Sequence, residues 1–134
     1  MRTYRGKTKE GRWVYGWYVK CRGHHYILPI HNDRIGFDER WIQEGANDED
    51  GWFEVIPETV GQSTGRKDES REKIYTGDKI EFIPVDGSTK VRQIAEVYYD
   101  EKRTAFCVKS IVWNCPLSFC KEVEIIHENP ELSK

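Results

Sequence analysis

The stretch that decides the fold class runs Arg12-Trp-Val-Tyr-Gly-Trp-Tyr-Val-Lys20. Aromatic and β-branched residues fill it, and these types favour the pleated, half-buried surface of a β-strand. Side chains alternate between the two faces of a strand, so the odd-numbered residues share one face: Trp13, Tyr15, Trp17 and Val19. Both faces are apolar, which predicts a strand within a barrel or sandwich.

A second strand is predicted directly after the first. Cys21-Arg-Gly23 indicates a turn, and His24–His31 is predicted to be the partner strand of a hairpin. Pro29 places that partner at a sheet edge or near a strand end. Gly16, in the middle of the first strand, indicates a bend or a close approach of another backbone.

Short strands and turn signals fill the rest of the chain. They predict a mainly β protein with small barrel-like domains, divided into residues 1–58 and 59–134. The strand order of the C-terminal part resembles SH3-like barrels. At most two short helices are predicted, over residues 37–44 and 116–120, and residues 61–71 are predicted to be a loop because glycines, serines and charges gather there.

Charge is distributed unevenly along the chain of 134 residues. The net charge of −2 excludes a strongly basic nucleic-acid binder by composition. Residues 1–23 nevertheless carry a net +6, and the remainder carries −8. The basic segment is either a solvated edge strand, whose cations prevent edge-to-edge pairing, or a surface that faces phosphates.

Four cysteines and a polar N-terminus set the expected compartment. No signal peptide and no apolar run of membrane-spanning length is visible. We therefore expect reduced thiols in a cytoplasm, no membrane partner and no cofactor.

Two blocks in the middle of the chain carry a family resemblance. They are Thr59-Val-Gly-Gln-Ser-Thr-Gly-Arg-Lys-Asp68 and Ile74-Tyr-Thr-Gly-Asp78. Together with Tyr4-Arg-Gly-Lys7 and Trp13-Val-Tyr-Gly16 near the start, and Glu128-Asn-Pro-Glu-Leu132 near the end, they resemble the YopX-like family of phage and prophage proteins. Arg71 stands where the family usually has glycine, and Glu124-Ile125 stands where it usually has Gly-Asn.

The resemblance implies a protein encoded by a phage or prophage and made in the bacterial cytoplasm. Self-assembly into a homo-oligomer is a further expectation that it carries. It implies no reaction, because the family is functionally uncharacterised. The expected role is that of a non-enzymatic accessory protein that contacts an unknown host or phage protein.

The segment from residue 61 to 68 is the first candidate site, because the family signature concentrates there. The residues of this predicted interaction loop are Gly61, Gln62, Thr64, Gly65, Lys67 and Asp68. The alternative is a structural turn, since glycines permit positive φ and the polar side chains can bond to the backbone.

The basic aromatic strand is the second candidate site, for single-stranded nucleic acid. Aromatic rings could stack on bases while cations hold phosphates, and the residues concerned are Arg12, Trp13, Tyr15, Trp17, Lys20 and Arg22. The alternative is that the rings form the core of the domain. Solvent exposure of the rings distinguishes the two hypotheses.

Catalytic and metal sites have weak support in the sequence. Cys115, Cys120 and His127 lack the short spacing and the fourth ligand of structural zinc. No nucleophile elbow or phosphate-binding loop appears. An enzyme would need a cleft in which Gln62, Lys67 and Asp68 converge with a histidine, so we predict neither a catalytic residue nor a metal.

Overall fold

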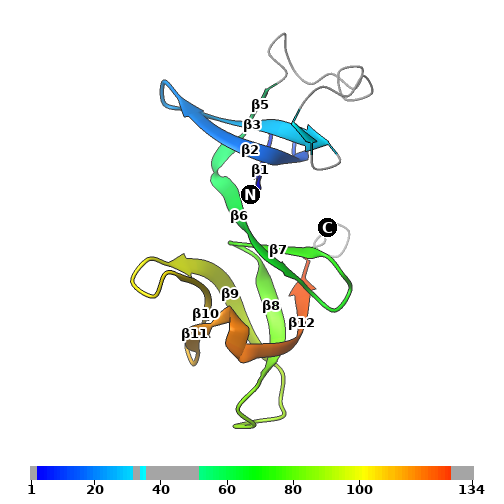
Figure 1. Cartoon of the computed structure of the whole chain (residues 1–134), viewed down its shortest axis with the longest axis vertical. Helices are drawn as coiled ribbons and strands as arrows, with labels where there is room; N and C mark the ends of the chain where they lie inside the picture. Colours follow the sequence, from blue (N-terminus) through cyan, green and yellow to red (C-terminus); the bar gives the residue numbers. More distant parts are fainter. Residues whose placement is uncertain (1–2, 32–33, 36–51, 128–134) are drawn as a thin grey trace. The chain divides into compact units, whose positions relative to one another are not determined.

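The computed structural model describes residues 3–31, 34–35 and 52–127, and strands dominate them. The prediction of a mainly β protein is confirmed. The chain divides into two compact units, Met1–Ser63 (unit 1) and Thr64–Lys134 (unit 2), with the division inside one long strand. Figure 1 shows the strands of each unit.

Unit 1 is built on antiparallel strands. Their bounds are β1 (Tyr4–Lys7), β2 (Trp13–Cys21), β3 (His24–His31), β4 (Arg34–Ile35), β5 (Phe53–Glu54) and the long β6 (Ile56–Lys67). The strands pair in the order β4-β3-β2-β1-β6, and β5 pairs with β3. The end of β6 lies in unit 2, where it pairs with β7 (Lys73–Tyr75).

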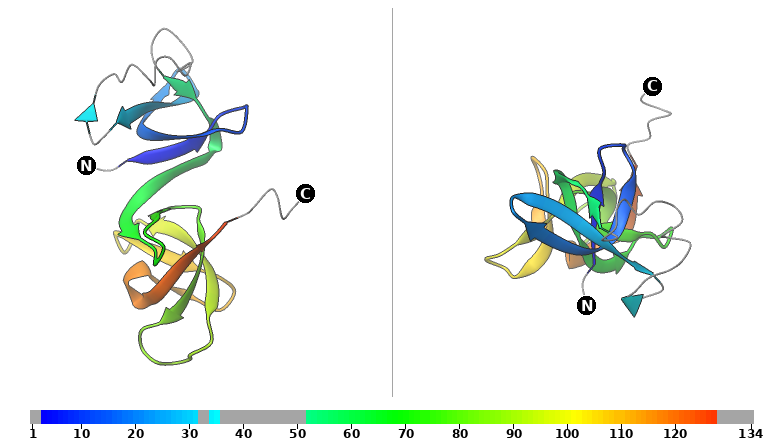
Figure 2. Two further views of the ribbon diagram at one scale, coloured as in Figure 1. Left: turned by 90° about the vertical axis from the view of Figure 1, so that its right-hand side faces the viewer. Right: turned by 90° about the horizontal axis from the view of Figure 1, so that it is seen from above.

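The predicted hairpin of β2 and β3 is confirmed. Arg22 and Gly23 make its turn with φ of 51° and 81°, and the register runs from Cys21 opposite His24 to Gly16 opposite Pro29. The predicted close approach at Gly16 is also present, because an added Cβ would lie 2.1 Å from the carbonyl oxygen of Leu28. Figure 2 shows this hairpin from two further sides.

The core of unit 1 is small and mostly aliphatic. Its buried members are Val14, Ile27, Phe53 and Val55, with Tyr4, Tyr18 and Val60 packed against them. Gly6 makes room for this core, since a Cβ there would lie 2.8 Å from the Val55 side chain. The core therefore takes the even-numbered face of β2.

The interpretation of the odd-numbered β2 rings as core is wrong for Trp13 and Tyr15. Their side chains are 39% and 48% exposed. Because the even-numbered face of β2 packs into the core, Trp13 and Tyr15 on the other face are left toward solvent, whereas Trp17 on that face is half-buried.

Unit 2 holds a second antiparallel sheet. Its strands are β8 (Lys79–Pro84), β9 (Gln93–Asp100), β10 (Ala105–Lys109), β11 (Asn114–Pro116) and β12 (Cys120–Ile126), in the order β11-β10-β9-β8-β12. The predicted helical turn near residues 116–120 is confirmed as the 3-10 helix η1 (Leu117–Phe119). Among the described strands this sheet is an open path rather than a closed barrel, and its SH3-like character stays a prediction.

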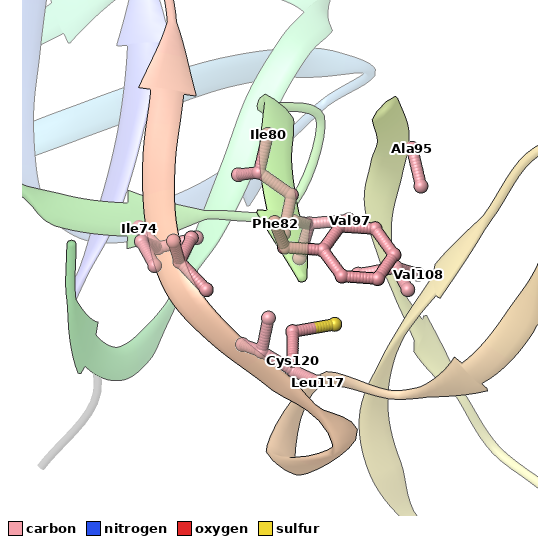
Figure 3. Packing of buried hydrophobic residues seen from close by; sticks show 9 residues of the cluster. Ile74, Ile80, Phe82, Ala95, Val97, Val108, Leu117 and Cys120 are labelled. Carbon is pink, nitrogen blue, oxygen red and sulfur yellow. The ribbon is translucent and has the colours of Figure 1, made fainter. Parts of the chain in front are cut away.

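Unit 2 has a core of its own, which holds nine buried residues among those described. Figure 3 shows its buried residues, which come from β7, β8, β9, β10, η1 and β12. They are Ile74, Ile80, Phe82, Ala95, Val97, Val108, Leu117, Cys120 and Val123. The ring of Phe82 meets Trp113 edge-on with centroids 6.1 Å apart, which is a favourable aromatic geometry.

Two further sequence predictions are a helix over residues 37–44 and the absence of a membrane-spanning segment. The helix predicted over residues 37–44 lies outside the described residues. In the described part, no helix has the length and apolar character needed to cross a membrane.

Candidate functional site

The predicted interaction loop is a strand for most of its length, so the prediction of a loop over residues 61–71 is wrong up to Lys67. Gly61 is buried opposite Arg5, and Gln62 lies opposite Tyr4, because β1 pairs with this part of β6. Glycine has low strand propensity, but the ladder to β1 on one side and to β7 further on overrides that preference.

Thr64 and Gly65 shape the point where β6 enters unit 2. The Thr64 hydroxyl donates to the carbonyl of Ile74 at 2.8 Å and accepts from the backbone N–H of Arg66 at 3.1 Å. Gly65 has a φ of +83°, and a Cβ there would meet open space. Glycine is therefore favoured at position 65 because of the positive φ, and not because a larger side chain would clash with a neighbour.

Arg66 holds the segment around η1. Its guanidinium donates to the carbonyls of Leu117 and Cys120, each at 2.8 Å. Sequence reasoning passed over Arg66 in favour of Lys67, whose side chain is exposed. The alternation of side chains along a strand places Arg66 and Lys67 on different faces, but a segment that is predicted to be a loop has no such alternation to use.

Asp68 organises the turn that follows β6. Its side chain is 7% exposed, and its carboxylate accepts backbone N–H groups from Ser70 and Glu72 at 2.9 Å and from Ile125 at 3.1 Å. The backbone N–H of Glu69 also donates to the carbonyl of Val123 at 2.9 Å. The turn thus satisfies polar groups along the outer edge of β12, an edge that would otherwise be open to another strand.

The second signature block closes a similar turn. The carboxylate of Asp78 accepts the backbone N–H of Tyr75 at 2.8 Å, and Gly77 has a φ of +95°. The Gly-Asp pair thus ends β7 in a turn before β8 begins. Side chains of both signature blocks therefore bond to the chain's own backbone, which favours the structural alternative for this segment.

A different surface gathers the side chains that a ligand could contact. It lies on the odd-numbered face of β1 and β2, and we call it the aromatic–basic face. Arg5 lies opposite Tyr15 and Lys7 lies opposite Trp13, and residues directly opposite in antiparallel strands share a face. Its residues are Arg5, Lys7, Trp13, Tyr15 and Trp17.

Cations lie against the rings of this face. The Arg5 guanidinium carbon is 4.7 Å from the centroid of the Trp13 ring, and the Lys7 Nζ is 5.8 Å from it. Both distances are within the range of cation–π attraction, which holds the long cationic side chains close to the indole. The cations are therefore ordered beside the exposed rings rather than spread into solvent.

The cations predicted for this site need correction. Arg12 and Lys20 have even parity and belong to the opposite face of β2, where the Arg12 guanidinium lies 5.2 Å from the centroid of the Phe53 ring. Arg22 lies in the hairpin turn. The cations beside the rings are Arg5 and Lys7, which sequence reasoning missed because the short strand β1 was not predicted.

The cysteines do not form a reactive centre. Burial raises the pKa of Cys120 to about 12, and burial also raises the pKa of Cys115. Both thiols thus stay protonated near neutral pH, and a protonated thiol is a poor nucleophile and metal ligand. Within residues 3–31, 34–35 and 52–127, no cluster of three or more His, Cys, Asp or Glu side chains could hold a metal ion.

Three histidines, His24, His25 and His127, are engaged in separate pairs. His24 lies 2.7 Å from a carboxylate oxygen of Glu54 on β5, and His127 lies 2.8 Å from one of Glu72. His25 hydrogen-bonds the hydroxyl of Tyr18. Each histidine contact links neighbouring parts of its own unit.

The fold and this surface define a mainly β protein in which the exposed rings of Trp13 and Tyr15 lie on one face with the half-buried Arg5 and Lys7. The family described as YopX protein matches residues 3–134, nearly the whole chain. The chain belongs to the YopX family, which confirms the resemblance seen in the signature blocks. A comparison with curated proteins finds no match.

Proposed function

We propose that this chain is a non-enzymatic accessory protein of phage or prophage type that works by binding, and that the aromatic–basic face is its binding surface. The observation that carries the proposal is the exposure of Trp13 and Tyr15, at 39% and 48%, beside ordered cations. Large aromatic side chains and arginine dominate the energetics of binding surfaces. While these two rings are exposed, their apolar surface does not contribute to the stability of the fold. A ligand that covered them would gain the free energy of burying that surface.

The position of the signature carboxylate supports a binding role over catalysis. An enzyme of the kind considered above would present Asp68 to a substrate. Its carboxylate instead accepts three backbone N–H groups, and Thr64 is likewise bonded to backbone. A group that is fully used by its own backbone has little capacity left for proton transfer or ligand contact.

Capture from bacterial cells that express the chain tests the proposal. Crosslinked protein and nucleic acid are compared for the wild type, a Trp13→Ser/Tyr15→Ser variant and a matched control. The control is Val91→Ser/Ile94→Ser, which removes exposed apolar side chains from unit 2 instead. We expect captured macromolecule to be lost with the β1–β2 variant and kept with the control; equal capture by all three proteins rejects the proposal.

A second candidate function, self-association, has its own observation in unit 2. Ile111 and Val112 lie in the turn between β10 and β11, with relative exposures of 105% and 76%. Two consecutive, highly exposed aliphatic side chains suit an apolar contact, and a two-fold contact with a second copy needs only this one patch. Light scattering of an Ile111→Ser/Val112→Ser variant tests it: a wild-type oligomer should become monomeric, and an unchanged mass rejects this candidate.

A further inference from the structure

The spacing of the rings on the aromatic–basic face restricts what can lie on it. Trp13, Tyr15 and Trp17 are alternate residues of β2, a strand in an antiparallel sheet. Alternate residues of such a strand are about 6.8 Å apart, because the rise is about 3.4 Å per residue. Consecutive bases in duplex DNA are only about 3.4 Å apart along each strand. Bases could therefore meet successive rings only in a strand that is unpaired and extended.

The cations add a second row, parallel to the first. Arg5 and Lys7 are alternate residues of β1, so they repeat at the same interval as the rings that they face. Neighbouring strands are about 4.8 Å apart. A polymer with a flat apolar group on one side and a negative charge on the other, at a matching repeat, would meet rings on β2 and cations on β1.

Charge on the wider segment agrees with a polyanionic ligand. Residues 1–23 carry a net +6, although the remainder of the chain carries −8. Arg5 and Lys7 belong to this basic segment, so they add to a local excess of positive charge that attracts an anion, although unit 1 and unit 2 each carry a net charge of −1. A protein ligand would need neither this charge nor a regular two-residue repeat of rings.

From these two rows we infer that the ligand of the aromatic–basic face is single-stranded nucleic acid, with successive bases on the exposed rings of Trp13 and Tyr15 and its phosphates toward Arg5 and Lys7. This inference rests on the proposed function, because it names the ligand of the same surface. Two exposed rings, with the half-buried Trp17 next to them, correspond to a short footprint of about four nucleotides, at the low end for barrels and sheets that bind single strands. The contacts are to ring faces and phosphates, so binding tolerates many sequences.

Fluorescence anisotropy with a labelled oligonucleotide of about 12 nucleotides tests the inference on the full chain. Oligothymidine, oligouridine and a duplex of equal length are compared in about 20 mM salt and upward. We expect both single strands to bind and the duplex to bind at least tenfold more weakly. With two phosphate contacts on a single strand, log K should fall against log salt with a slope of about −1.4.

Two variants separate the ring row from the cation row. Trp13→Ala/Tyr15→Ala should weaken binding at least tenfold, because each stacked base contributes strongly. Arg5→Gln/Lys7→Gln should weaken binding and bring the salt slope close to zero. The matched control is Arg12→Gln/Lys20→Gln, which removes the same charge from the opposite face of β2 and should leave the slope unchanged. Circular dichroism confirms that each variant is folded.

Three outcomes overturn the inference. These are no single-strand binding in low salt, equal binding of the duplex, and an equal loss with the opposite-face control. If the capture experiment then still shows dependence on Trp13 and Tyr15 for a protein, the proposed binding surface stands and its ligand class is wrong. If neither experiment depends on these rings, both the inference and the proposed function fail.

Discussion

The two units differ in how they use their most distinctive side chains. In unit 2 the signature residues Thr64, Arg66 and Asp68 donate to or accept from backbone groups, around a core of nine buried residues. Among the described residues of unit 1, four form a buried core, and the rings of Trp13 and Tyr15 face solvent. The signature of the family thus serves stability in unit 2, and surface chemistry is concentrated in unit 1. A sequence motif can therefore consist of residues that stabilise the backbone rather than residues that bind a ligand.

The largest expected effect comes from matched aromatic truncations in the two units. Phe82→Ala removes a fully buried ring from unit 2 and should lower the free energy of unfolding by about 4 kcal/mol. Trp13→Ala removes an exposed ring from unit 1 and should cost less than about 1 kcal/mol. Urea denaturation followed through amide NMR signals of each unit measures both values. Similar losses for the two variants would contradict the contrast between the units.

Asp68 provides the next largest effect. Asp68→Ala leaves the N–H groups of Ser70, Glu72 and Ile125 without their acceptor, and should cost about 3 kcal/mol. Asp68→Asn keeps one acceptor oxygen and should cost less. The same denaturation experiment checks both variants, with Lys67→Ala as the exposed neighbouring control. A loss for Asp68→Ala no larger than the control value would show that the carboxylate is not structural.

The smallest effect is a dependence on pH in unit 2. The N–H groups of Arg103 and Lys102, and the charge of Arg103, hold the pKa of Asp100 below its usual value, against a smaller opposing effect of desolvation. A carboxyl whose folded pKa is depressed contributes stability above its unfolded pKa of about 3.9 and loses it as pH falls through the folded pKa. Thermal melts at neutral pH and at pH values below about 3.9 measure how much stability unit 2 loses on acidification. This loss should be smaller for Asp100→Asn than for the wild type. Equal pH dependence would contradict this role.

Periodicity and turn chemistry predicted much of the fold. The bounds predicted for β3 agree with the structure, and Gly16 shows the predicted close backbone approach. These successes rest on local signals, since alternation and glycine positions act within a few residues. The short strand β1 was missed because four residues with two cations give little apolar pattern of their own.

The candidate sites were predicted less well than the strands, because they depend on contacts between residues that are distant in the sequence. Gly61, Gln62 and Thr64 have the composition of a loop, but ladders to β1 and β7 make them a strand. The cations beside the rings come from β1, whereas Arg12 lies against Phe53 on the opposite face from Trp13, as its even parity indicates. Which face of a strand is covered is decided by tertiary packing, so the exposure of Trp13 could not be read from its own strand.

The turn of the β2–β3 hairpin also offers a place for selective chemical labelling. Cys21 is exposed there, whereas Cys107 and Cys120 are buried and burial raises the pKa of Cys115. A maleimide dye at neutral pH should therefore attach at Cys21 without any engineered cysteine, since exposed thiols react first. Cys21 shares the odd parity of Trp17 on β2, which places the dye at the end of the ring row, where its emission would report the arrival of a ligand.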